Sequence, residues 1–411
     1  MSTLKLNPPF RVEHIGSFVR PKELYDLREL LEQGKCTRED LIPAEDAAVK
    51  HVVKLQRDLG LGSITDGDMR VFEGVFDKLG GMTYLPHRPM TEFKPYIPHV
   101  KILSAMGMTE SPTWYCSGKI KRIVPFYVDH FKALKAVVPP EDVSRIKINM
   151  CPPTWIHQRH GSDLTYDPAV YKSDDEYFND LGIAYRAEIK ELYELGCRNI
   201  QLDDPTFCYF CNEDMISGME AAGVDHEALL DTYIRATNLC TADRPADLHI
   251  GLHMCRGNFR GGIHFSEGGY HRIAVKLFNS VDVDTFYLEY DNERSGDFSP
   301  LKHLPPNKAA VLGIVTTKSP KLEDAQALKA RIHEAADVVA AGNPPRSKEA
   351  ALNQLVFPVD FLVVLIIFCD FRLCISPQCG FASVWQGNPV TEEDQKAKLQ
   401  LLLQVAKEVW Q

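Results

Sequence analysis

The stretch SDDEYFNDLGIAYRAEIKELYELGCRNIQLDD, residues 173–204, decides the fold. Apolar residues recur at helical spacing from Asp174 to Leu195, and Ser173 stands in front of them as the expected N-cap. A short segment of alternating polar and apolar residues from Asn199 to Asp203 follows, and this pattern and length are typical of a strand. A long helix that leads directly into a buried strand predicts an α/β protein with a parallel sheet.

The same alternation continues on both sides of this stretch. Eight segments are predicted as strands: Arg11–Ser17, Gly62–Asp66, Lys147–Cys151, Asn199–Asp203, Leu248–His253, Thr285–Tyr290, Ala310–Thr316 and Leu373–Ser376. Helix start signals lie between them at Pro21 and Ser173, and after the last at Thr391, which has Asp394 three residues on. Eight parallel strands predict a single (β/α)8 TIM-type barrel over residues 1–411, although an open doubly wound sheet would show the same alternation.

Two stretches interrupt the alternation, and the first is the segment Met69–Val143 between predicted strands 2 and 3. It is too long for an ordinary βα loop. It contains two further strand candidates, Tyr96–Leu103 and Ser117–Pro125. We therefore expect an inserted hairpin that covers the barrel mouth as a lid.

The second interruption is the segment 355–372, in which 14 of the 17 residues from Leu355 to Phe371 are apolar. A helix that crosses a bilayer needs about 20 residues, so this run is too short. One interpretation is a buried strand that competes with Leu373–Ser376 for the eighth position. The other is an aberrant insertion, such as a retained intron, because removing residues 355–372 restores a direct helix-to-strand connection.

Composition excludes several classes of protein. The 46 Lys and Arg residues against 56 Asp and Glu residues give a net charge of −10, and the sequence has no local basic patch. We therefore expect neither nucleic acid nor a membrane surface as a partner. The N-terminus lacks the pattern of a secretory signal, and 11 cysteines are too sparse for a disulfide scaffold, so we expect a cytoplasmic protein.

Polar side chains end most of the predicted strands, where barrel enzymes carry their reactive groups. His253 and Cys255 are two residues apart, so in extended chain they point to one face. Glu289 ends an apolar run, where a buried carboxylate needs a cation, and Cys379 follows the last strand. One histidine, two thiolates and one carboxylate suit zinc. The competing interpretation is that both cysteines are ordinary buried thiols.

A second motif, Cys208-x-x-Cys211, follows the predicted strand that ends at Asp203. A single C-x-x-C pair is weak evidence for a metal or redox site, and two ordinary loop thiols are the simpler interpretation. Asp203 and Asp204 could hold an ammonium group, although adjacent acids at a strand end often cap the next helix.

Six short motifs together resemble the catalytic domain of the cobalamin-independent methionine synthase family, over about residues 8–410. In chain order they are Ile15-Gly16-Ser17, Asp66-Gly67-Asp68, Gln201-Leu202-Asp203-Asp204-Pro205, His253-x-Cys255, Leu288-Glu289 and Pro377-Gln378-Cys379-Gly380. The resemblance implies a (β/α)8 barrel with zinc bound by His253, Cys255, Glu289 and Cys379. It also implies that Ser17, Asp68 and Asp203 hold homocysteine, which receives a methyl group from a 5-methyltetrahydrofolate-type donor to give methionine.

The sequence departs from the family pattern at three points. It has room for one barrel where the full-length synthase has two, so it is similar to the shorter stand-alone relatives. It has Asp68 where the synthase has Glu. It also has Lys318 where the synthase has a histidine that protonates the folate, and a lysine is more obviously an anion-binding group.

These departures keep two alternatives to folate-dependent methyl transfer open. One is another zinc-dependent thiol alkyl transfer, such as the opening of an epoxide by a thiol cofactor, in which Lys318 would hold an anionic substrate. The other is a catalytically silent barrel that binds zinc or another ligand.

Overall fold

The computed structural model describes residues 8–70, 74–105, 107–259, 263–353, 373–384 and 387–410. The predicted aberrant insertion, residues 355–372, lies outside the described residues.

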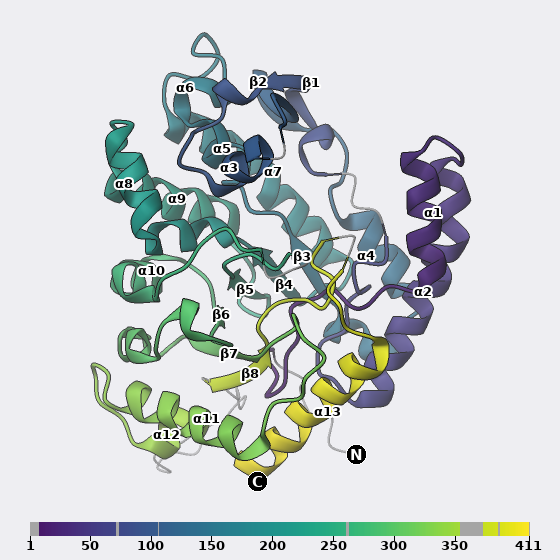
Figure 1. Ribbon diagram of the computed structural model, residues 1–411, viewed down its shortest axis with the longest axis vertical. Helices are drawn as coiled ribbons and strands as arrows, with labels where there is room; N and C mark the ends of the chain where they lie inside the picture. The colour runs from purple at the N-terminus through teal and green to yellow at the C-terminus, as the bar shows by residue number, and fades with distance from the viewer. Residues whose placement is uncertain are drawn as a thin grey trace.

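A six-stranded parallel sheet lies at the centre of the molecule (Figure 1). Its strands pair in chain order and are β3 (Lys147–Met150), β4 (Asn199–Asp203), β5 (His249–Met254), β6 (Thr285–Glu289), β7 (Ala309–Val315) and β8 (Leu373–Pro377). Six of the eight strand predictions are therefore confirmed. The last strand begins at Leu373, as the short candidate predicted.

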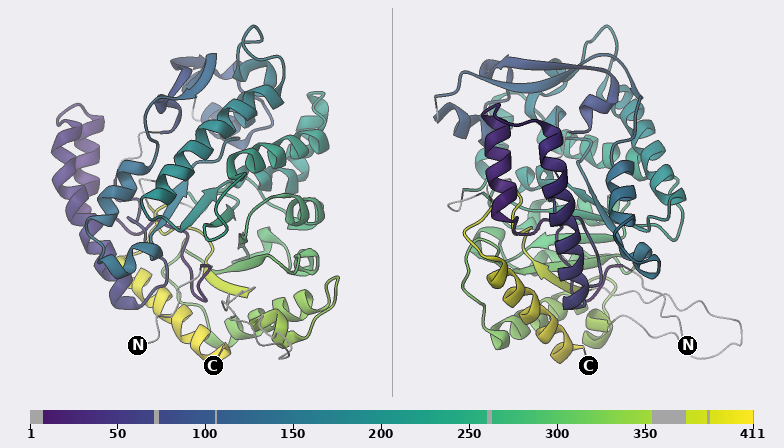
Figure 2. Two further views of the ribbon diagram at one scale, coloured as in Figure 1. Left: turned by 180° about the vertical axis from the view of Figure 1, so that it is seen from behind. Right: turned by 90° about the vertical axis from the view of Figure 1, so that its right-hand side faces the viewer.

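Helices connect most of these strands and cover the outside of the curved sheet (Figures 1 and 2). They are α1 (Lys22–Glu32), α2 (Arg38–Leu59), α3 (Pro98–Ala105), α4 (Val128–Lys135), α5 (His157–His160), α6 (Ser162–Thr165), α7 (Asp174–Glu194), α8 (Glu213–Ala221), α9 (His226–Thr241), α10 (Ala274–Ser280), α11 (Ala325–Ala340), α12 (Lys348–Asn353) and α13 (Glu392–Val409). Two predicted helix N-caps are confirmed. The Ser173 side chain accepts a hydrogen bond from the backbone N–H of Glu176, and Thr391 forms a capping box with Asp394.

The first two predicted strands are reduced to single bridges at the two edges of this sheet. Val12 pairs in parallel with Ile375 of β8, and Ile64 pairs in parallel with Ile146, next to β3. Between the two segments, the N–H of Phe18 donates to the carbonyl of Gly67 at 3.0 Å and Thr65 Oγ1 donates to the carbonyl of Gly16 at 2.7 Å, so they do not form a regular ladder with each other. Regular pairing among the described residues thus gives an open parallel sheet of six strands, and the closed (β/α)8 barrel stays a prediction.

The segment Met69–Val143 contains a two-stranded antiparallel sheet of β1 (Leu79–Pro89) and β2 (Glu110–Arg122). The predicted strand Tyr96–Leu103 is wrong, because Pro98 opens helix α3 there, and proline is well suited to the first turn of a helix. Strand β1 was not predicted because it contains prolines, which a two-stranded sheet tolerates at its edges.

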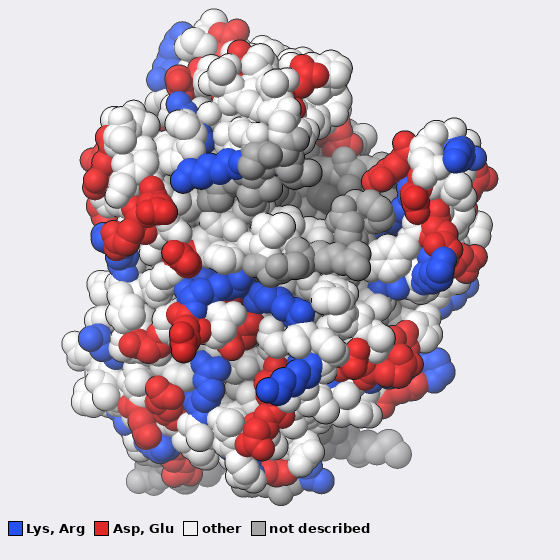
Figure 3. Space-filling model, viewed as in Figure 1, with Lys and Arg blue, Asp and Glu red and all other residues white. Residues whose placement is uncertain are grey.

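The surface carries interspersed basic and acidic side chains on the face seen in Figure 3, with a hollow beside α1. Within the described ranges, no helix combines the length and the apolar character that crossing a bilayer requires.

Candidate active site

Three of the four predicted metal ligands converge at the carboxyl ends of the strands. One ligand atom each from His253, Cys255 and Cys379 lies within 4.8 Å of the other two, and all three residues are buried. They come from β5, from the residue directly after it, and from the turn after β8. A hydrogen bond from the thiol of Cys255 lowers the pKa of Cys379 well below its usual range, although burial opposes this shift. The cluster is thus built to carry a thiolate.

The two ring nitrogens of His253 have different surroundings. Nδ1 donates to Oδ1 of Asp203 at 2.9 Å, whereas Nε2 is buried and has no hydrogen-bond partner among the described residues. A buried nitrogen without a partner is costly, and a ring oriented by a carboxylate through its other nitrogen is the usual arrangement of a metal-binding histidine. The donor set therefore fits a zinc ion held by Nε2 of His253 and the two thiols.

Glu289, the fourth predicted ligand, lies beside this cluster but faces cations. Its Oε1 accepts from Nε of Arg294 at 2.8 Å and from the second terminal nitrogen of Arg294 at 2.5 Å. Its Oε2 accepts from the backbone N–H of Arg256, the neighbour of Cys255, at 2.7 Å. Burial raises the pKa of Glu289, but the positive charges of Lys318, Arg294 and Arg256 outweigh it and lower the pKa.

Lys318, the predicted catalytic residue, lies close to the carboxylates of Glu289 and Asp291. Its Nζ lies 2.8 Å from Oδ2 of Asp291 and 3.8 Å from Oε1 of Glu289. It is not among the residues that line the cavity described below. The geometry thus joins Lys318 to the carboxylates beside the cluster.

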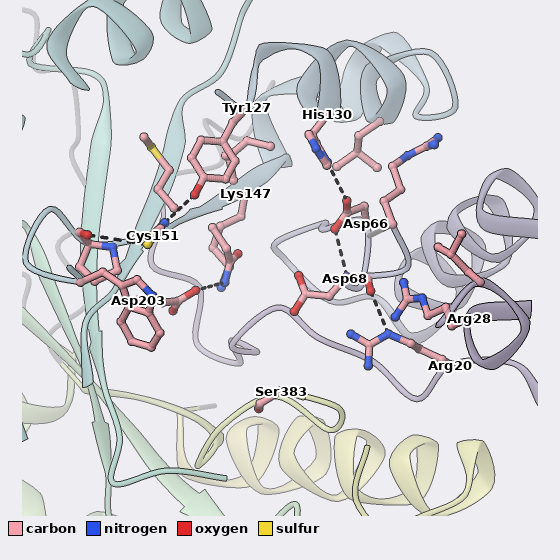
Figure 4. Close-up of a pocket in the computed structure, with 18 of the residues that line it drawn as sticks. Arg20, Arg28, Asp66, Asp68, Tyr127, His130, Lys147, Cys151, Asp203 and Ser383 are labelled. Carbon is pink, nitrogen blue, oxygen red and sulfur yellow. Dashed lines mark hydrogen bonds and ion pairs between the residues drawn. The ribbon is translucent and has the colours of Figure 1, made fainter. Parts of the chain in front are cut away.

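A cavity of about 730 Å³ opens next to the cluster (Figure 4). Its charged lining comprises Arg20, Arg28, Glu32, Asp66, Asp68, Arg70, Lys147 and Asp203, with the imidazole of His130. Two lining residues reach the cluster: Asp203 contacts His253, and Ser383 Oγ lies 3.2 Å from Sγ of Cys379. The cavity is large enough for two small substrates, and one end of it abuts the cluster.

Of the predicted substrate-binding residues, Asp68 and Asp203 line this cavity. Asp68 sits in a tight turn with φ of 55° and exposes its side chain to the cavity. Desolvation by the surrounding protein disfavours the charged form of Asp68, and the negative charge of Asp66 adds to this effect. Together they raise the pKa of Asp68 to about 7. Asp203 is already engaged, because its Oδ1 holds His253 and its Oδ2 accepts from Nδ2 of Asn149 at 2.9 Å.

Ser17 supports the turn that carries Cys379. Its backbone carbonyl accepts from the N–H of Phe381 at 2.9 Å, and its Oγ accepts from the N–H of Ala382 at 3.3 Å. A Cβ atom on Gly380 would lie only 1.8 Å from Ser17 Oγ, so this position needs glycine. The motifs around Ser17 and Cys379, far apart in the sequence, therefore form one packed unit.

Asp204 and the Cys208-x-x-Cys211 motif make contacts that stabilise the local fold. Asp204 caps the 3-10 helix η4 (Pro205–Cys211) through a hydrogen bond from the N–H of Thr206, and burial raises its pKa to about 6. Cys208 and Cys211 are buried in this helix and are hydrogen-bonded to each other. Within the described chain, Cys208 and Cys211 do not belong to a group of three or more metal-ligating side chains.

Several residues of the cavity wall have little or no signal in the sequence. Arg28 lies on α1, where a lone arginine on a surface helix gives no signal, and His130 lies on α4 inside the segment Met69–Val143. Asn149 had one weak signal, because it is a polar residue between the apolar Ile148 and Met150 of a predicted strand.

Comparison with known proteins agrees with the resemblance seen in the sequence motifs. Residues 168–408 match the family model described as cobalamin-independent synthase, catalytic domain. The uncharacterized protein YxjH of Bacillus subtilis is 32% identical over 407 residues, which cover 98% of this chain and 95% of that protein. A methionine synthase of Sulfurisphaera tokodaii is 31% identical over 296 residues, which cover 68% of this chain and 75% of the synthase.

Solved structures resemble this one over nearly its whole length. A Listeria monocytogenes protein assigned as a vitamin-B12 independent methionine synthase matches with a TM-score of 0.69 and 28% identity, covering 98% of this chain and 99% of that one. A Shewanella B12-independent methionine synthase, in complex with selenomethionine, matches with a TM-score of 0.59 at 17% identity over 91% of this chain and 90% of that one, which is a likeness of fold.

Proposed function

Because this chain belongs to the family of cobalamin-independent synthase catalytic domains, we propose that it methylates the thiol of homocysteine to give methionine. The proposed methyl donor is a 5-methyltetrahydrofolate. The proposed metal is zinc, held by His253, Cys255 and Cys379, with Glu289 as the fourth ligand. The observation that carries the proposal is the convergence of three ligand atoms within 4.8 Å at one end of the cavity.

A bound zinc ion would lower the pKa of a substrate thiol, so that the sulfur is available as a nucleophile near neutral pH. The chain's own residues prepare this end of the cavity. Asp203 orients His253 so that Nε2 faces the cluster, and Ser17 braces the turn that carries Cys379. Both interactions are made within the protein, so the ligand atoms are positioned before any substrate enters.

The remaining predicted residues have distinct proposed roles. Asp68 exposes a carboxylate to the cavity, where it would attract the ammonium group of homocysteine. Lys318 contributes to catalysis by holding Asp291 and balancing the negative charge of Glu289. Glu289 would have to exchange its contact with Arg294 for the metal, which makes it the weakest of the four ligands.

The test is metal analysis together with cobalt substitution, with and without homocysteine. We expect one metal per chain, and we expect a thiolate-to-cobalt absorption band that grows when homocysteine is added. We also expect methionine to form from 5-methyltetrahydrofolate and homocysteine. A protein that holds no stoichiometric metal, or whose spectrum ignores every small thiol, would contradict the proposal.

A donor screen tests the reaction class. If the protein binds a thiol at the metal but transfers no methyl group from 5-methyltetrahydrofolate and opens an epoxide instead, the second alkyl-transfer reaction is correct and methyl transfer is wrong.

A further inference from the structure

The methyl transfer proposed above needs an acid in the cavity, and this inference rests on that proposed function. When a thiolate attacks the methyl carbon of 5-methyltetrahydrofolate, the carbon–sulfur bond forms and the bond between carbon and N5 breaks. The electron pair stays on N5, which is a poor leaving group unless it receives a proton. In the sequence, Lys318 stands where the synthase has its proton-donating histidine. Its ammonium group pairs with Asp291, however, and it does not line the cavity.

Asp68, whose pKa is about 7, is assigned above to the ammonium group of homocysteine, which needs the ionised carboxylate. Three other lining groups that carry a proton are poorly suited to give it up. Lys147 is fully buried and its Nζ lies 3.1 Å from Oε2 of Glu13. Burial raises the pKa of Tyr127 and of Cys151 above their usual ranges. At neutral pH Tyr127 and Cys151 therefore hold their protons too tightly to exchange them in each catalytic cycle, and the ammonium of Lys147 is committed to Glu13.

His130 is the imidazole that lines the cavity. It comes from α4, and its side chain keeps 23% of its exposure. Its Nδ1 faces Oδ2 of Asp66 at 3.9 Å. Burial raises the pKa of Asp66, but His130, the backbone N–H of Asp68 and the charge of Arg70 together outweigh it and lower the pKa, so Asp66 stays ionised beside the imidazole.

The two sides of the cavity carry different chemistry (Figure 4). Asp203 and Ser383 mark the end that contacts the metal-ligand cluster, where the acceptor thiol would bind. His130 and Asp66 lie together on the other side, across the open space from Asp203. A donor molecule that presents its methyl group to the cluster would fill the space between these two groups.

We propose that His130 is the catalytic acid that protonates N5 of the methyl donor as the carbon–nitrogen bond breaks, with Asp66 as its positioning residue. The imidazolium gives its proton to N5 and becomes neutral, and cavity water restores that proton before the next turnover. Asp66 stays ionised throughout and compensates the charge of the imidazolium. The inserted segment thus supplies a catalytic group.

The test compares two methyl donors that differ only in their need for a proton. With 5-methyltetrahydrofolate, we expect His130→Gln to lower kcat by roughly 10²-fold or more, which is the usual contribution of a general acid. With trimethylsulfonium, whose leaving group is neutral dimethyl sulfide, the same variant should keep nearly the wild-type kcat. Asp66→Asn should show the same donor-dependent pattern, with a smaller loss.

The matched control is His87→Gln. His87 also pairs with a carboxylate, Glu110, at 2.7 Å in the same inserted segment, but it lies on the hairpin and does not line the cavity. This control should match the wild type with both donors. Thermal unfolding of all variants checks that each one is folded.

Each other outcome overturns a specific statement. Equal loss of kcat with both donors would mean that His130 has a structural role, and no loss with either would mean that it takes no part. If the wild type used trimethylsulfonium but not 5-methyltetrahydrofolate, the proposed folate donor would be wrong and the proton donor would be refuted with it. If it methylated homocysteine from neither donor, the proposed function itself would fail.

Discussion

The two ends of the central sheet differ in how completely their polar groups are paired. At the amino ends, the first residues of four neighbouring strands are polar and buried: Lys147, Asn199, His249 and Thr285. His249 bridges Asn199 at 3.0 Å and Thr285 at 2.7 Å, and none of the four side chains has a buried polar atom without a partner. At the carboxyl ends, buried atoms of Asn149, Gln201 and His253 have none within the described chain.

This difference separates stability from function. A completed hydrogen-bond network in a buried layer fixes the structure and has no capacity left for a ligand. Unpaired buried atoms cost stability, and they are retained where something else is to bind. The three converging ligand atoms lie at the unpaired end, and the cavity, which also reaches Lys147, abuts them there.

The largest expected effect comes from removing a ligand at the carboxyl ends. Cys255→Ser should remove stoichiometric metal and lower kcat/KM by about 10³-fold, because a metal supplies several kcal/mol to such a reaction. Metal analysis and initial rates measure both effects. Cys208→Ser is the matched control, and metal loss in that variant would instead support the Cys208-x-x-Cys211 motif as the metal site.

The amino ends should respond in stability and not in metal content. Lys147→Met leaves Glu13, which is fully buried, without its counter-ion, and we expect a loss of about 3–5 kcal/mol in the free energy of unfolding. Urea titration measures this loss. Glu13→Gln added to Lys147→Met should restore part of it, and folded protein should keep its metal. Loss of metal from the folded variant would show that the two ends are not separate.

Asp203→Asn tests the residue that joins the cavity to the cluster. An amide cannot hold Nδ1 of His253 as a carboxylate does, so we expect metal affinity to fall by about 10- to 100-fold. Competition with a chelator measures it. An unchanged affinity with a raised KM for homocysteine would mean that Asp203 binds substrate and leaves His253 alone.

The smallest effect concerns the ionisation of Asp68. Its pKa of about 7 means that the carboxyl group is neutral below pH 7, and an ammonium group then binds less well. We expect the KM for homocysteine to rise by up to about tenfold per pH unit below pH 7. Asp68→Asn should have a high KM at all pH values, without this pH-dependent component. The measurement is the KM for homocysteine of the Asp68→Asn variant divided by that of the wild type, at several pH values between pH 6 and pH 8. A ratio that does not change with pH would contradict the prediction.

The sequence predicted the elements whose signals are local. β6 and β7 are short, largely apolar runs buried on both faces, and such runs are recognisable without knowing their partners. The helix starts at Ser173 and Thr391 depend on side chains within three residues. The His253-x-Cys255 pair was equally visible, since two residues of one strand share a face.

Other features depend on residues distant in sequence. Pairing of the two N-terminal segments rests on single bridges to Ile375 and Ile146, and their own sequences do not reveal that the carbonyl of Gly16 accepts from the side chain of Thr65. The contact of Ser17 with the Cys379 turn likewise joins opposite ends of the chain.

The sequence by itself therefore determined the α/β class, the order of the central strands and the placement of His253 and Cys255 on one face, because periodicity and spacing are local properties. Tertiary structure decided which side chains face the cavity and which charges neutralise one another. It turned Glu289 toward Arg294, joined Lys318 to Asp291 and brought His130 opposite Asp203. These outcomes follow from burial and charge pairing between distant segments, since a buried charge takes whichever partner the fold brings within reach.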